Sequence, residues 1–205
     1  MAAVQGSAAR LVEVALGEIG YIEGPKDNET KYGAFTKSNF QPWCGSFVMW
    51  CANEAGVKMP NTVYTPAGAQ AFIKAGTWQP VETAAPAVGD IAYFDFPNDG
   101  VDRISHVGIV VKVNDDGTVD VAEGNTSADK KGDQRNGGEA CLKNRAYKKK
   151  NGSKLRKSQL VFIVGFGRPA FGQAVKPKAP AAKKAAPTKK AAPSKGGSAK
   201  PAAAK

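Results

Sequence analysis

The segment QPWCGSFVMWC at positions 41–51 decides how this chain folds. Pro42 marks the start of a helix, and Gly56 stands where a helix of this length would stop. Apolar and small residues recur through the segment, and just beyond it, with the period of a helix, at positions 44, 47, 48, 51, 52 and 55. The pattern predicts a half-buried helix with Cys44 in its first turn.

Cys44 has two interpretations. The first turn of a helix carries unpaired backbone N–H groups and the positive end of the helix dipole, and both favour a thiolate. Most free cysteines, however, are small buried hydrophobic residues. The helix alone does not decide between a reactive thiol and a core residue.

Composition limits the class of protein. The 205 residues allow one medium-sized domain with a core that is stable unaided. Three cysteines, in neither CxxC nor CxxH spacing, suggest neither a disulfide framework nor a zinc site. We expect no export signal at the start of the chain and no membrane-spanning segment, because no apolar run has the required length.

The positive charge is concentrated at the C-terminus. Residues 173–205 hold nine lysines and no acid, so the rest of the chain carries only +2 of the net charge of +11. The composition of this tail is almost entirely Lys, Ala, Pro, Ser and Gly, which cannot bury a core. We therefore expect a folded domain over residues 1–172 and a disordered cationic tail over 173–205.

Predicted helices come first and predicted strands follow. The strongest strand is ISHVGIVVKV at 104–113, with a turn at Asn114–Gly117 that leads back into a partner strand. Helices first and strands afterwards predict an α+β domain, with helices packed on an antiparallel sheet. The predicted helices cover about 5–18, 44–55 and 65–74, a loop covers 21–41, and strands cover 91–96, 104–113, 118–122 and 160–166.

A basic run lies between the last two predicted strands. Residues 143–157 contain eight basic residues and no acid, and Cys141 lies just before them. We predict a solvated loop here, with a free thiol at Cys141; a basic rim that faces an anionic polymer is the alternative.

The single histidine, His106, lies near the start of the strongest predicted strand. A lone histidine on a strand is usually a packed residue. Here, however, the returning strand ends in Glu123-Gly124-Asn125, which places an acid and an amide near the imidazole. A cysteine-protease mechanism needs a thiolate, a base, and a group that orients the base. Cys44, His106 and either Glu123 or Asn125 fill these roles; the alternative for the last two is a turn at a strand end.

Four motifs follow one another along the chain: Trp43-Cys44-x-x-Phe47-Val48-x-Trp50, Gly89-Asp90-Ile91, His106-Val107-Gly108-Ile109-Val110 and Glu123-Gly124-Asn125. In this order they resemble the CHAP domain, a family of cysteine- and histidine-dependent amidohydrolases and peptidases with a papain-like fold. The resemblance covers about residues 8–168. His106 follows Cys44 by 62 residues, and Glu123 follows His106 by 17.

The resemblance implies a role for each of these positions. Cys44 would be the nucleophile, His106 the base, Glu123 the orienting residue and Asn125 a supporting polar residue. The backbone N–H of Cys44 would stabilise the oxyanion, and Gln41 is a possible second donor. The related NlpC/P60 peptidases orient the base with a second histidine, which this chain lacks.

The resemblance also bears on metals. Some CHAP domains bind calcium through an acidic loop before the cysteine helix, near Asp27, Asn28 and Glu29 here. The alternating oxygen ligands of such a loop are missing, so we expect no required metal and no other cofactor.

The resemblance implies a peptidoglycan hydrolase that cleaves either the N-acetylmuramoyl-L-alanine amide or a bond within the wall peptides. With no export signal expected, a phage endolysin fits best: we expect a monomer that stays in the host cytoplasm until a holin opens the membrane. Bacterial peptidoglycan would be its partner. The tail would either bind anionic wall polymers or only keep the protein soluble. The alternatives are a virion-associated lysin and, in a different class, a nucleic-acid-binding protein that uses the tail.

Overall fold

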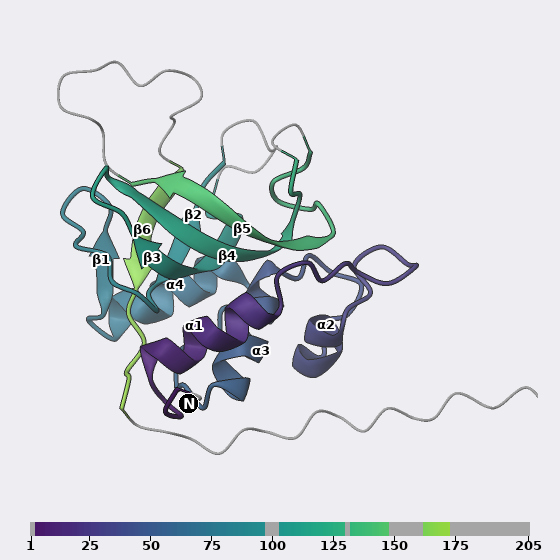
Figure 1. Cartoon of the computed structure of the whole chain (residues 1–205), viewed down its shortest axis with the longest axis horizontal. Helices are drawn as coiled ribbons and strands as arrows, with labels where there is room; N and C mark the ends of the chain where they lie inside the picture. The colour runs from purple at the N-terminus through teal and green to yellow at the C-terminus, as the bar shows by residue number, and fades with distance from the viewer. Residues whose placement is uncertain (1–2, 97–102, 130–131, 148–161, 173–205) are drawn as a thin grey trace, which may run out of the picture.

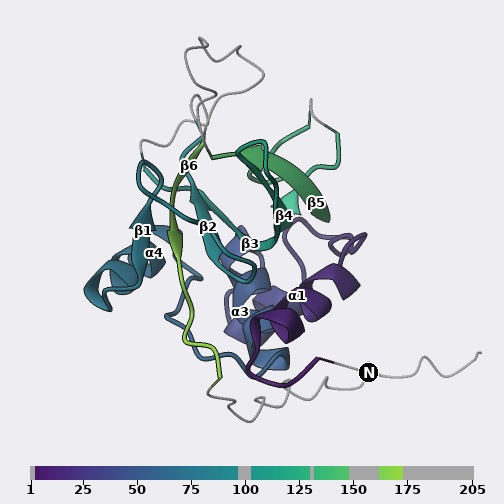
Figure 2. The same ribbon diagram turned by 60° about the vertical axis from the view of Figure 1, so that its left-hand side comes forward.

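The computed structural model describes residues 3–96, 103–129, 132–147 and 162–172. The predicted tail, 173–205, lies outside the described residues, as do residues 148–157 of the basic run. Figures 1 and 2 show helices α1 and α3 on one side of a twisted sheet. The described helices are α1 (Ala8–Gly17), α2 (Lys31–Thr36), α3 (Cys44–Glu54) and α4 (Thr65–Lys74).

The sheet has six strands in the order β1-β6-β2-β3-β4-β5, and every neighbouring pair is antiparallel. The α+β architecture expected from the sequence, with helices packed on an antiparallel sheet, is therefore confirmed. The strands are β1 (Trp78–Pro80), β2 (Ile91–Phe94), β3 (His106–Val113), β4 (Thr118–Thr126), β5 (Glu139–Ala146) and β6 (Ile163–Gly167).

Two apolar clusters stabilise this arrangement. The larger one lies between the helices and the sheet, where Phe47 and Val48 of α3 belong to the same buried cluster as Val107 and Ile109 of β3. A second cluster contains alternate residues of the same strands, among them Phe94 and Val110, and therefore lies on the other face of the sheet. Burial on both faces explains why β2 reads as a continuous apolar run.

The central helix follows the prediction closely. Helix α3 begins at Cys44 and ends at Glu54, and Gly56 follows with a φ of +65°. The face identified from the sequence is buried at Phe47, Val48 and Cys51. Helix α4 also forms as predicted, with Pro66 in its first turn.

The prediction of a loop over 21–41 is wrong, because α2 lies within it. The Thr30 side chain caps the helix by accepting from the backbone N–H of Gly33 at 2.9 Å. Lys37 ends the helix in the left-handed region, with a φ of +61°. Six residues are too few to show a helical period, so the capping pattern was the available signal.

The prediction of a loop from 143 is also wrong where the structure describes it. Residues Glu139–Ala146 form β5, which pairs along β4, and Cys141 lies in this strand opposite Glu123. β5 is an outer strand with basic side chains, which are typical of sheet edges and hide the strand pattern. The short strand β1 was likewise not predicted; Trp78 within it packs against Tyr93 with the ring centroids 5.4 Å apart.

Candidate active site

Cys44 is the first residue of α3 and is buried, with 3% of its surface exposed. The residue before it, Trp43, forms no side-chain cap on the helix, so the N-terminal N–H groups are left to the site. Gly45 allows a close approach at this end: a β-carbon there would collide with the carbonyl oxygen of Thr62. The thiol is thus held at the positive end of the α3 dipole, beside the unpaired N–H groups of its first turn.

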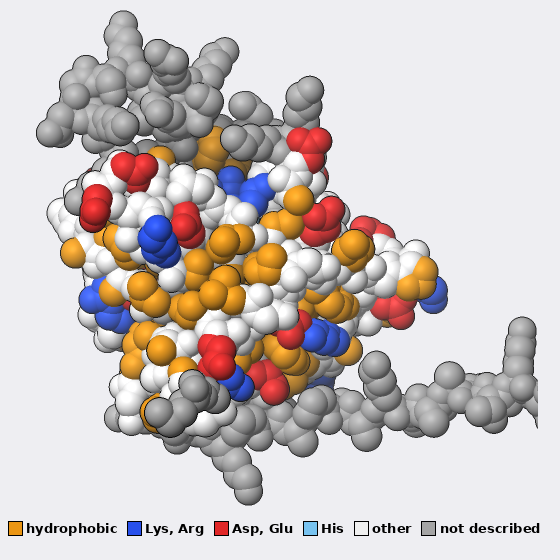
Figure 3. All heavy atoms as spheres, viewed as in Figure 1, with side chains coloured by type: hydrophobic (Ala, Val, Ile, Leu, Met, Phe, Trp, Pro, Cys, Tyr) orange, Lys and Arg blue, Asp and Glu red, His pale blue; other side chains and the backbone are white. Residues whose placement is uncertain are grey.

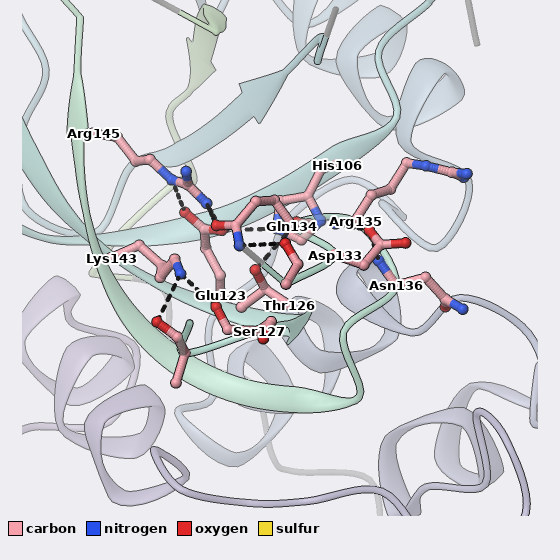
Figure 4. Close-up of polar contacts among 12 residues, drawn as sticks. His106, Glu123, Thr126, Ser127, Asp133, Gln134, Arg135, Asn136, Lys143 and Arg145 are labelled. Atoms are coloured by element: carbon pink, nitrogen blue, oxygen red, sulfur yellow. Dashed lines mark hydrogen bonds and ion pairs between the residues drawn. The ribbon is translucent and has the colours of Figure 1, made fainter. Parts of the chain in front are cut away.

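His106 is the first residue of β3 and is fully buried. Its Nε2 lies 3.0 Å from Oε2 of Glu123, on the neighbouring strand β4 (Figure 4). Its other nitrogen, Nδ1, makes no hydrogen bond of standard geometry with the described residues. The imidazole is therefore held from one side only.

Cys44 lies close enough to the imidazole to interact with it. Because Nδ1 has no regular hydrogen bond, we regard the sulfur as a neighbour of the ring and not as a formed partner. Catalytic hydrogen bonds are often long or poorly aligned before substrate binds. With Nε2 facing Glu123, Nδ1 is the nitrogen left for the thiol.

The surroundings of His106 favour its charged form. Burial disfavours the imidazolium, but the Cys44 sulfur and the Glu123 carboxylate outweigh that penalty and raise the pKa of His106 to about 9. An imidazolium beside a thiolate is the resting form that a thiol hydrolase needs.

Glu123 is fully buried and ionised. Burial alone would raise its pKa, but hydrogen bonds and charge from Arg145, together with His106, lower the pKa to about 2. Nε of Arg145 donates to Oε1 at 2.7 Å, and Nη2 donates to Oε2 at 2.7 Å. Oε2 is therefore shared between the imidazole and the guanidinium.

Two glycines in the motifs make room for these side chains. Gly108 lies opposite Glu123 in the β3–β4 pair, and a β-carbon there would come within 2.8 Å of Cγ of Glu123. Gly124 lies against α3, where a β-carbon would come within 2.7 Å of the Phe47 side chain. The first glycine clears the path from Glu123 to His106, and the second lets β4 approach the cysteine helix.

Asn125 is brought to the site but does not contact the imidazole by a hydrogen bond that we observe. It is buried with a φ of +58°, and its Nδ2 donates to Oδ1 of Asn136 at 3.0 Å. Its own Oδ1 is buried and has no partner among the described residues. Of the two residues that the sequence left open for the orienting role, Glu123 is the one bonded to His106.

Gln41 lies three residues before Cys44 and is exposed. Its role as an oxyanion donor stays a prediction, as does that of the Cys44 backbone N–H. In the segment where some CHAP domains bind calcium, Nδ2 of Asn28 donates to Oδ2 of Asp27 at 3.0 Å. Over the described ranges, no group of three or more His, Cys, Asp or Glu side chains is arranged to hold a metal ion.

The Gly89-Asp90 motif has a structural role away from the imidazole. Arg168, just after β6, donates from Nε to Oδ1 of Asp90 and from Nη2 to Oδ2, both at 2.8 Å. The backbone N–H of Ala87 donates to the same Oδ2 at 2.8 Å. Asp90 thus ties the turn before β2 to the end of the last strand.

Sequence reasoning missed Arg145, together with the two phenylalanines beneath it. The guanidinium carbon lies 5.6 Å from the ring centroid of Phe94 and 5.4 Å from that of Phe96. No local pattern announces this contact, because it depends on how β5 pairs with β4.

The surface gives no sign of a dominant charge on the face that bears α1 and β5. Figure 3 shows acidic, basic and hydrophobic side chains interspersed there. The exposed hydrophobic residues include Leu16 and Ile19 near the end of α1 and Leu142 of β5. None of the helices in the described part of the chain has the length and hydrophobicity needed to cross a bilayer.

Comparison with known proteins agrees with the motifs. No curated protein matches the chain. One solved structure that aligns with it is a protein from Staphylococcus aureus subsp. aureus Mu50, described as similar to a lipoprotein of the NLP/P60 family. The two are 16% identical with a TM-score of 0.34, and the alignment covers 60% of this chain and 35% of that protein. Residues 36–125, which include Cys44, His106, Glu123 and Asn125, match the family model of the CHAP domain.

Proposed function

We propose that this protein is a thiol-dependent peptidoglycan hydrolase in which Cys44 is the nucleophile and His106 the base. One observation carries the proposal: the only histidine in the sequence is buried between Glu123, at 3.0 Å, and the cysteine at the start of α3. A buried imidazole with a carboxylate on one nitrogen and a thiol near the other is the arrangement that acyl transfer requires. The match of residues 36–125 to the CHAP domain model supports the wall peptide as the substrate class.

The proposed first half-reaction begins with the thiolate of Cys44. The Cys44 thiolate attacks the carbonyl carbon of the scissile amide, and the developing oxyanion is stabilised by N–H groups at the start of α3. The His106 imidazolium gives its proton to the leaving amine, and a thioester forms on Cys44. Glu123 accepts from Nε2–H throughout, which keeps Nδ1 directed at the reacting atoms.

The second half-reaction regenerates the enzyme. Neutral His106 takes a proton from water, and the resulting hydroxide attacks the thioester. The acyl group leaves as a carboxylic acid, and the thiolate and imidazolium return. No step in this sequence uses a group other than Cys44, His106, Glu123 and the backbone at the start of α3.

Loss of lytic activity in two variants tests the proposal. Purified protein should clear a suspension of Gram-positive cell walls, and Cys44→Ala or His106→Ala should abolish clearing while the circular dichroism spectrum is retained. Cys141→Ala is the matched control, because Cys141 is also buried but lies on β5 and should be dispensable. Clearing by Cys44→Ala at the parent rate would refute the mechanism.

The scissile bond is a finer question. We propose either the N-acetylmuramoyl-L-alanine amide or a peptide bond of the stem or cross-bridge. Mass spectrometry of digested muropeptides distinguishes these, because each cleavage exposes a different new amine.

We also propose a lytic role like that of a phage endolysin, with a virion-associated lysin as the alternative. Residues 173–205 would then hold the enzyme to anionic wall polymers. Deletion of these residues should leave turnover of soluble muropeptides intact and weaken binding to walls, most clearly at low salt. Tight binding of duplex DNA by the full chain, lost on deletion, would instead support the nucleic-acid interpretation.

A further inference from the structure

Arg145 lies outside the matched region and binds Glu123 directly. It lies on β5, and its guanidinium binds both oxygens of the Glu123 carboxylate at 2.7 Å (Figure 4). Glu123 is fully buried, while the Arg145 side chain is 12% exposed. A two-point contact fixes the plane of the carboxylate as well as its position.

The guanidinium is itself held in place. Its central carbon, Cζ, lies within cation–π distance of Phe94 and Phe96, whose rings stack on each other with centroids 5.7 Å apart. The same two rings flank His106, at centroid distances of 5.5 and 5.6 Å. Nη2 of Arg145 also donates to Oε1 of Gln134 at 3.4 Å. Arg145 and His106 therefore contact the same two rings, Phe94 and Phe96, and both bind the Glu123 carboxylate.

We propose that Arg145 is a positioning residue that fixes Glu123, and through Glu123 the Nε2 side of the His106 ring. The inference rests on the proposed function of this site and extends it by one residue. Unless Oε1 is held by Arg145, the Glu123 carboxylate can turn about its last bond and present Oε2 to His106 in many orientations. With Arg145 in place, one orientation remains.

The charges around the pair support this role. Cys44 from α3, His106 from β3, Glu123 from β4 and Arg145 from β5 alternate in sign when the thiol is ionised, so the cluster is neutral as a whole. Asp133 from the loop before β5 is near His106, and Lys143 of β5 is near Glu123. Removal of Arg145 would leave the four-membered cluster with one excess negative charge, which disfavours the thiolate.

The shape of the guanidinium matters as well as its charge. Lysine offers a point charge on a flexible chain and does not form the two parallel bonds that fix a carboxylate plane. Arg145→Lys therefore keeps the charge and loses the fork. Arg145→Met loses both and keeps much of the apolar contact with the two rings.

The experiment compares these variants by their effect on the only imidazole in the chain. In the parent, the Nε2 proton donated to buried Glu123 should give a slowly exchanging NMR signal. We expect Arg145→Met and Arg145→Lys to broaden or lose this signal. On a soluble muropeptide, Arg145→Met should lower kcat about 100-fold with little change in KM, as expected when a catalytic group is misplaced.

Thiol alkylation provides a readout that needs no peptidoglycan. At pH 6 to 7, iodoacetamide should modify Cys44 first, because burial raises the pKa of Cys51 well above its ordinary value and the pKa of Cys141 to about 11. We expect alkylation of Cys44 to be about tenfold slower in Arg145→Met than in the parent.

Arg168→Met is the matched control, because Arg168 grips buried Asp90 with the same two atoms but lies away from the imidazole. It should destabilise the fold and leave the histidine signal and the alkylation rate of Cys44 unchanged. A double variant completes the test. If Arg145 acts through Glu123, then Glu123→Gln with Arg145→Met should be no slower than Glu123→Gln alone.

The inference would be overturned if folded Arg145→Met kept the kcat, the alkylation rate of Cys44 and the histidine NMR signal of the parent. It would also be overturned if Arg145→Lys kept all three. If Arg145→Met does not fold, the test uses Arg145→Lys, because its lysine still supplies a positive charge beside the buried Glu123 carboxylate. Failure of the proposed function is distinguishable: Cys44→Ala would then hydrolyse walls like the parent, while the imidazole signal and alkylation would still report on Arg145.

Discussion

In the described part of the chain, two buried carboxylates are bound by arginine in the same way, and only one of them belongs to the candidate active site. Glu123 with Arg145 and Asp90 with Arg168 each use Nε and Nη2 on the two carboxylate oxygens, at 2.7 Å and 2.8 Å respectively. Both carboxylates are fully buried. The bonding between each carboxylate and its arginine is thus nearly identical.

The two pairs differ in their remaining contacts. Oε2 of Glu123 faces the imidazole of His106, whereas Oδ2 of Asp90 accepts from the backbone N–H of Ala87. Arg145 is 12% exposed and lies over two aromatic rings, while Arg168 is 39% exposed and also donates to the carbonyl oxygen of Ala85 at 3.0 Å. The two pairs therefore differ in what else the carboxylate contacts, and not in the ion pair itself: Glu123 contacts an imidazole in the candidate active site, whereas Asp90 contacts a backbone N–H group in a structural clamp.

The largest expected difference comes from neutralising each carboxylate. Glu123→Gln keeps the shape of the side chain and removes the charge that holds the imidazolium, so kcat should fall about 1,000-fold, somewhat less than for the corresponding change in a serine protease triad. The measurement is turnover of a soluble muropeptide, with circular dichroism to check the fold. Activity within threefold of the parent would show that the imidazole does not depend on this carboxylate.

Asp90→Asn should act on stability instead. It weakens a clamp that joins the turn before β2 to the end of β6, and the buried amide leaves Arg168 without its counter-charge. We expect a loss of about 2 kcal/mol in the free energy of unfolding, moderated because Arg168 is partly exposed. Urea unfolding measures this, and kcat per folded molecule should stay unchanged. A large fall in kcat would erase the distinction between the two pairs.

Gly108→Ala should sharpen the comparison by moving Glu123 without altering its chemistry. The new methyl group would come within 2.8 Å of Cγ of Glu123 and 2.6 Å of Cγ1 of Val121. We expect about a tenfold loss of kcat from displacement of the carboxylate. Gly17→Ala is a control, because a β-carbon at Gly17 meets nothing within 4 Å. Equal activity of the two variants would mean that the carboxylate tolerates the shift.

The smallest expected effect is the dependence of stability on pH. His106 has a raised pKa of about 9, so its contribution is fully present below the unfolded value near 6.5 and is lost as the pH rises through 9. Glu123 has a lowered pKa of about 2, so its contribution is present above the unfolded value near 4.5 and is lost as the pH falls through 2. Both contributions are complete only between about pH 4.5 and 6.5.

We therefore expect the melting temperature to fall between pH 6.5 and 9, by a few degrees for a change on the order of 1 kcal/mol. His106→Gln removes the group that titrates and should make the melting temperature less dependent on pH over this range. Asp90→Asn should leave the pH dependence of the melting temperature unchanged. A slope that His106→Gln does not alter would assign the alkaline loss to other groups.

Residues close in sequence explain what could be predicted. The period of α3 placed Cys44 in its first turn, and the hairpin between β3 and β4 placed His106 near Glu123. Both inferences use local pattern or a short turn, where the backbone leaves few alternatives. The order of the motifs supplied the rest of the candidate site.

What could not be predicted depends on distant pairing. Arg145 reaches Glu123 because β5 pairs with β4 across a loop, and neither residue type nor spacing fixes that register. Asn125 and Glu123 were equivalent candidates in the sequence, since two residues on one strand end approach a neighbour equally well. Only the side-chain geometry separates them: Glu123 bonds to the imidazole, and Asn125 bonds to Asn136.

The position of β5 has a practical consequence for anyone who trims or grafts this domain. The family match ends at residue 125, but Arg145, the cation that binds the Glu123 carboxylate, lies twenty residues later in the sequence. A fragment cut at the end of the match would retain every motif residue and expose a bare acid beside the imidazole. The smallest unit worth transplanting therefore extends at least through the strand that ends at Ala146.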